Sequence, residues 1–100
     1  MKLGILVNTD KYLADIVGVT KSATKKGHEV VIFAMDAGTL LLEHPDFSAL
    51  CEIEGVQMSF CSHNAEKFGA KTEGLSEDII CGSQYNNAQM IHNADRVIVL

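Results

Sequence analysis

Short, nearly continuous apolar runs alternate along the chain with segments in which apolar residues recur every three or four positions. The continuous runs predict strands that are buried on both faces, because each face of such a strand must then be apolar. The strands are expected near residues 2–8, 28–35, 56–61, 78–81 and 96–100. The strand at 78–81 has the least support, since it rests on three residues, Ile79, Ile80 and Cys81.

The segments between these runs have helical spacing. The first helix is expected from Lys11 to Lys26, before Gly27, with apolar or small residues at helical intervals: Leu13, Ile16, Val17, Thr20 and Ala23. Shorter helices are expected near residues 36–43, 46–54, 62–68 and 84–93. A strand, a helix and a strand within 35 residues favour a right-handed parallel crossover. The whole alternation predicts one α/β domain over residues 1–100, a three-layer α/β/α fold with a five-stranded, mostly parallel sheet.

Composition excludes several classes of protein. Hydrophobic residues make up 47% of the 100 residues and charged residues 21%, as in an ordinary globular domain. Eight basic against 13 acidic residues give a net charge of -5, which argues against nucleic acid as a partner. No apolar run approaches the roughly 18 residues of a membrane span. The apolar N-terminus lacks a small-residue cleavage site and is interpreted as a strand, not a signal peptide.

The three cysteines are an odd number and do not have the spacing of a disulfide framework. Reduced thiols, and therefore a cytoplasmic location, are expected. A five-stranded parallel sheet also needs helices over both faces, and this chain has few. We therefore expect apolar surface to remain uncovered and the protein to self-associate.

Cysteine is the residue with the most informative positions in this sequence. Ligands of parallel α/β proteins bind at the carboxyl ends of the strands. The loops expected at that edge begin at Asn8, Met35, Cys61 and Cys81, so two of the four start with a thiol. A reactive thiol site at this edge is therefore the first hypothesis.

Cys61 ends a predicted strand and directly precedes the helix expected at 62–68. Unpaired N–H groups and the positive end of a helix dipole favour the thiolate, which is the nucleophile. On this ground we expect Cys61 to be the catalytic thiol and to alkylate faster than Cys51 or Cys81. The alternative is that Cys61 is a small buried hydrophobe at the end of a strand.

His63 and Cys81 are further candidates. His63 could polarise the Cys61 thiol or donate to a bound anion, or it could be an ordinary exposed residue. Cys81 could be a resolving thiol, a second sulfur site or part of the core. A zinc site would need Cys61, His63, Cys81 and His92 together. The sequence has no Cys-x-x-Cys pair and no tight His spacing, so we expect no metal and no cofactor.

Five segments carry a resemblance that extends over nearly the whole chain: KLGILVN, GHEVVIFAM, VQMSFC with the following helix and Gly69, LSEDIICGS and ADRVIVL. With them the sequence resembles the DsrE/DsrF-like family of small sulfur-relay proteins. The resemblance implies that Cys61 is the sulfur-accepting thiol. It also implies self-association as a homotrimer or homohexamer, or assembly with related subunits.

The function implied by this resemblance is sulfur relay. Cys61 would hold sulfane sulfur as a persulfide and pass it from a donor protein to an acceptor protein, with a sulfurtransferase-like activity if the protein is an enzyme. Relay members of the family carry basic residues just after the cysteine, where this chain has Ser62, His63 and Asn64. His63 or the start of the helix would then hold the anion. Two alternatives stay open: an oligomeric module that binds a ligand or protein without catalysis, and a thiol redox protein that uses Cys61 and Cys81.

Overall fold

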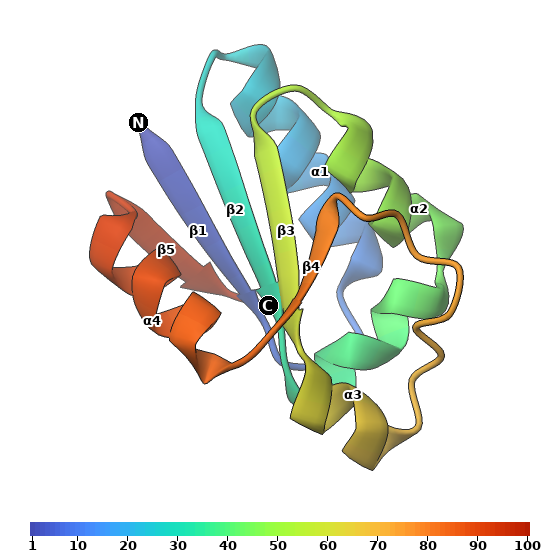
Figure 1. Cartoon of the computed structure of the whole chain (residues 1–100). Helices are drawn as coiled ribbons and strands as arrows, with labels where there is room; N and C mark the ends of the chain where they lie inside the picture. Colours follow the sequence, from blue (N-terminus) through green and yellow to red (C-terminus); the bar gives the residue numbers. More distant parts are fainter.

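Five parallel strands form a single sheet in the computed structural model, which describes all residues from 1 to 100 (Figure 1). They are β1 (Lys2–Val7), β2 (Glu29–Ala34), β3 (Val56–Cys61), β4 (Ile79–Gly82) and β5 (Arg96–Val99). Every predicted strand is present, including the weakly supported fourth one. The three-layer α/β/α fold is confirmed, and its sheet is parallel throughout.

The strand order, β4-β3-β2-β1-β5, determines which face each helix covers. From β1 to β4 the chain advances strand by strand in one direction. Right-handed crossovers in one direction place all their helices on the same face of the sheet. After β4 the chain returns past three strands to β5, so the helix of that connection lies on the opposite face.

The helical segments follow this rule. On the first face lie α1 (Leu13–Lys25), η1 (Asp36–Glu43), α2 (Pro45–Ser48), η2 (Ala49–Glu52) and α3 (Ser62–Phe68), whereas α4 (Gln84–Asn93) crosses the other face alone (Figure 1). The helix expected at 46–54 is two short pieces, and the segment 36–43 is a 3-10 helix. Pro45 begins α2 because it has no N–H to leave unpaired, and His44 Nδ1 accepts a hydrogen bond from Asp46 N at 3.2 Å.

The two faces of the sheet are buried to different extents. The large core cluster lies between the sheet and α1, η1, α2, η2 and α3, and its fully buried members include Ile5, Ile16, Ile32 and Phe47. Under α4 only three residues are buried together: Phe33, Cys61 and Met90. Met90 is the only buried residue of α4. The helix is therefore held on the sheet mainly through one side chain.

Gly4 of β1 provides the space for this contact. A Cβ atom at Gly4 would lie 3.1 Å from Met90 Cγ and 3.3 Å from Ala94 Cβ, closer than most side chains tolerate. On either side of α4 the sheet keeps apolar side chains in solvent: Ile80 of β4 is 53% exposed and Val99 of β5 is 57% exposed. The uncovered apolar surface expected from the small number of helices is thus found on the α4 face.

Gly38 tests the packing of η1 against the end of β1. A Cβ atom at this position would overlap the backbone oxygen of Val7. We predict that Gly38→Ala lowers the free energy of unfolding by about 1–3 kcal/mol, because β1 or η1 must shift. Urea denaturation followed by circular dichroism measures this change.

Gly18→Ala is the matched control. Gly18 lies within α1, and nothing comes within 4 Å of a Cβ atom placed there. This variant should raise the free energy of unfolding by about 0.5–1 kcal/mol through helix propensity alone. Equal unfolding midpoints for Gly38→Ala and the wild type would show that η1 does not pack on β1 as described.

Candidate functional site

The carboxyl ends of β1 to β4 meet at one edge of the sheet, as the sequence predicted. Cys61 is the last residue of β3, and α3 begins at the next residue, Ser62. Cys61 is also the residue that precedes the first turn of α3, so its position along the chain agrees with the prediction. The direction of its side chain does not.

Cys61 points to the α4 face of the sheet. Its neighbour Phe60 belongs to the large core on the other face, and successive strand residues alternate between faces. The Cys61 side chain packs with Phe33 and Met90, and the residue is 4% exposed. In this conformation the thiol is covered by α4.

Helix α3 lies on the opposite face. Ala65 of α3 is buried in the large core, on the side of the sheet away from the Cys61 side chain. The cysteine makes no side-chain hydrogen bond to the first turn of α3. The contact between the Cys61 thiol and the start of α3, which the sequence predicted, is therefore not made in this conformation. The reason is that the strand turns its thiol to one face while the chain continues to the other.

Cys81 is exposed and lies on the other side of the sheet from Cys61. It is the register partner of Phe60, whereas Cys61 is opposite Gly82. Register partners on parallel strands share a face, so the two thiols point in opposite directions. A disulfide requires Cβ vectors that converge, so it would need the backbone of β4 to move. This geometry does not support the alternative of a Cys61–Cys81 redox pair.

The remaining candidates are not brought together. His63 is exposed on α3 and makes no hydrogen bond with Cys61. Cys51 is partly buried beside the large core. No three His, Cys, Asp or Glu side chains come close enough to one another to hold a metal ion.

Asn64 and Asp36 form a contact at this edge that sequence reasoning did not find. The Asn64 Oδ1 atom accepts a hydrogen bond from the backbone N–H of Asp36 at 3.0 Å, which ties α3 to the end of β2. Asp36 has a φ of 48°, a left-handed conformation that aspartate tolerates better than most residues. Thr39 Oγ1 donates to Asp36 O at 2.7 Å and closes the turn. No spacing in the sequence signals this contact, because the two residues are 28 positions apart.

The fold and this edge define the class of the protein: a small parallel α/β domain with a cysteine at the end of its third strand. No protein-family model matches the chain, and no curated protein matches it in sequence. Among solved structures, the YchN protein from E. coli matches all of this chain with all of its own, at a TM-score of 0.70 and 16% identity. MTH1491 from Methanobacterium thermoautotrophicum, a protein of unknown function, has a TM-score of 0.76 and 14% identity, with 99% of this chain and 98% of its own covered.

The chain shares its fold with both structures over its whole length, and the α/β fold implied by the sequence resemblance is confirmed. At these identities the likeness is one of fold. None of the helices in the chain is both long and apolar enough to cross a membrane.

Burial predicts the order in which the three thiols react with iodoacetamide in the native protein. Cys81 is exposed, Cys51 is partly buried and Cys61 is buried, so we expect Cys81 to be modified first and Cys61 last. This order differs from the one expected from the sequence, because α4 covers Cys61. Mass spectrometry of tryptic peptides over time measures the three rates.

Unfolding in urea is the control, since all three thiols should then react at similar rates. Modification of Cys61 as fast as Cys81 in the native protein would mean that α4 does not cover it in solution.

Proposed function

We propose that this protein is a sulfur carrier that holds sulfane sulfur as a persulfide on Cys61. The Cys61 thiolate attacks the terminal sulfur of a donor persulfide. The donor S–S bond breaks, a new S–S bond forms on Cys61, and the donor leaves as a thiolate. An acceptor thiolate then attacks this terminal sulfur. The S–S bond to Cys61 breaks, the terminal sulfur moves to the acceptor, and Cys61 leaves as a thiolate. No oxidant and no cofactor enter this exchange.

The observation that carries the proposal is the position of Cys61. It ends β3 at the carboxyl edge of the sheet, the edge at which parallel α/β proteins bind ligands. The DsrE/DsrF-like fold supports the proposal, because the cysteine that the resemblance identifies is at this place in the fold. The neighbours Phe33 and Met90 are uncharged and apolar, so they would keep water and small thiols away from a persulfide.

A buried carrier thiol must be uncovered for transfer. Helix α4 is the cover, and Met90 is its only buried side chain. The other residues of α4 are exposed or half-buried, and five of them are carboxamides, so they lose little when the helix moves into water. We infer that a donor or acceptor protein displaces α4 and so reaches Cys61, whereas a small thiol does not.

The other expectations from the sequence complete the proposal. The donor and the acceptor of sulfur are proteins, the activity is sulfurtransferase-like, and the compartment is the cytoplasm. His63 is proposed to donate a hydrogen bond to the terminal sulfur once that sulfur reaches past the start of α3. Cys81 remains a candidate for a second sulfur site, on the face of β4 that points away from the Cys61 side chain. The burial of Cys61 favours one alternative, a module that binds a ligand without catalysis.

Persulfide loading tests the proposal directly. After incubation with a protein persulfide donor, such as a cysteine desulfurase supplied with cysteine, the Cys61 peptide of the wild type should gain the mass of one sulfur atom. Cys61→Ser should abolish this gain and keep the fold, because serine is close in size to cysteine. Alkylation of the persulfide followed by mass spectrometry locates the sulfur.

Cys81→Ser and Cys51→Ser are the matched controls and should leave the loading of Cys61 unchanged. His63→Ala removes the donor and should shorten the lifetime of the persulfide without preventing its formation. Sulfur found on Cys81 and never on Cys61 would contradict the proposal and favour the exposed thiol as the carrier.

We further propose that the protein is a homotrimer or a homohexamer in solution, with the exposed apolar residues of β5, at the edge of the α4 face, in the interface. Light scattering should give a mass of three or six copies of the 10.9 kDa chain. Val99→Lys places a charge among the exposed apolar residues of this face and should shift the mass toward the monomer. Phe68→Lys changes an exposed residue on α3 and should leave the mass unchanged. A monomer mass for the wild type at micromolar concentration would rule out this assembly.

A further inference from the structure

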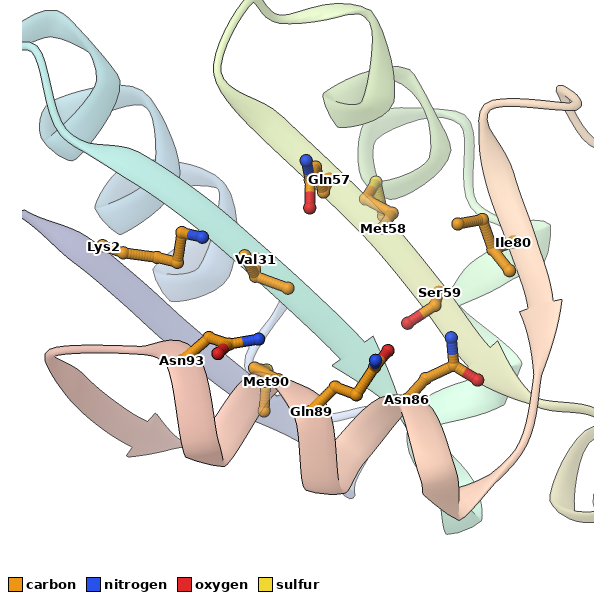
Figure 2. A pocket seen from close by; sticks show the side chains of 10 residues that line it. All are labelled: Lys2, Val31, Gln57, Met58, Ser59, Ile80, Asn86, Gln89, Met90 and Asn93. Carbon is orange, nitrogen blue, oxygen red and sulfur yellow. The ribbon is translucent and has the colours of Figure 1, made fainter.

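A cavity of about 150 Å³ lies between α4 and the part of the sheet formed by β1, β2, β3 and β4 (Figure 2). Its lining consists of Lys2, Val31, Gln57, Met58, Ser59, Ile80, Asn86, Gln89, Met90 and Asn93. Four of these side chains are carboxamides, one is a hydroxyl and one is an ammonium. A volume of this size holds about five water molecules, or a small organic molecule.

Lys2 is the only charged residue of the lining, in a protein with a net charge of -5. Its ammonium group has no carboxylate partner, because the one ion pair of the structure joins His44 and Asp46. Two carboxylates lie nearby. Asp95 accepts a hydrogen bond from the backbone N–H of Lys2, and Glu29 is the register partner of Lys2 on β2 but lines only the adjoining hollow. The cavity itself therefore offers one unpaired positive charge and no negative one.

Apart from Gln57, the polar side chains of the lining lie in two places. In Figure 2, Lys2 and Asn93 are toward one end of the cavity, and Ser59, Asn86 and Gln89 are toward the other. Asn86 uses its Oδ1 atom to accept from Ser83 N and Gln89 uses its Nε2 atom to donate to Tyr85, so each keeps one amide group free. None of these polar atoms is a buried orphan, since the only two in the chain are Thr20 Oγ1 and Asn87 Oδ1. The free amide groups therefore face solvent, and a ligand in the cavity can reach them.

We propose that this cavity is a binding site for a small organic monoanion with a polar group at its far end. The Lys2 ammonium and the Asn93 amide hold the carboxylate through charge-assisted hydrogen bonds. The hydroxyl of Ser59 and the free amide groups of Asn86 and Gln89 hold the uncharged polar end. Val31 and Met90 contact the carbon chain between the two ends.

Three probes of similar size separate the effect of ligand charge on binding from the effect of ligand shape. Succinamate has one carboxylate and one carboxamide, succinamide has two carboxamides, and succinate has two carboxylates. Titrations of the full chain followed by ¹⁵N–¹H NMR should show succinamate binding with a millimolar dissociation constant, and the shifts should centre on Ser59 and Gln89. Succinamide should bind at least about tenfold more weakly, because it lacks the charge that Lys2 recognises. Succinate should also bind more weakly than succinamate, because its second charge faces uncharged amides.

Lys2→Met keeps an unbranched side chain that is only one atom shorter and removes its charge. It should weaken succinamate binding at least about tenfold and make the affinities for succinamate and succinamide equal. Asn93→Leu changes the same end of the cavity without touching β1 and should weaken succinamate binding in the same direction. Lys67→Met, on α3 and outside the cavity, is the control and should bind succinamate like the wild type.

Three results would overturn the proposal. They are equal binding of succinamate and succinamide to the wild type, unchanged binding by Lys2→Met, and no chemical-shift change with any of the three probes.

Discussion

The contact between Met90 and Gly4 is the interaction on which the α4 side of the molecule depends. The right-handed rule for crossovers places five helical segments on one face of the sheet and leaves one helix for the other. That helix must cross several strands at once, and it does so on one buried side chain that the absence of a Cβ atom in β1 accommodates. The covered thiol, the cavity beside it and the exposed apolar edges follow from this sparse packing.

The sequence was sufficient to predict the elements but not the faces they cover. Apolar runs locate strands because a strand that is buried on both faces must be apolar at nearly every position. Even the three residues Ile79, Ile80 and Cys81 were enough to predict β4. Strand order has no comparable signal, since crossovers from β1 to β2 and from β4 to β5 look alike in sequence. The side of the sheet on which α4 lies depends on that order, so the cover of Cys61 could not be foreseen.

The candidate site was predicted in position and missed in direction, yet the strand contains a signal for the direction. In β3, Gln57 and Ser59 alternate with Val56, Met58 and Phe60. Cys61 shares its face with the two polar residues, which marks that face as the less completely buried one. The same two residues line the cavity. The contact between Asn64 and Asp36 has no such pattern, because it depends on how α3 and η1 meet in space.

Magnitudes decide whether a covered Cys61 is compatible with transfer between proteins. Returning Met90 and Phe33 to water costs about 1.5–3 kcal/mol for each side chain, or about 3–6 kcal/mol together. A complex with a micromolar dissociation constant has a binding free energy of about 8 kcal/mol, which is enough to displace α4 and leave a margin. A small thiol makes too few contacts to supply this energy. The weak attachment of α4 would therefore act as a filter that admits a protein partner to Cys61 and excludes a small thiol. Because Met90 also lines the cavity, a ligand bound there would add its own contacts to α4 and raise the energy that a partner must supply.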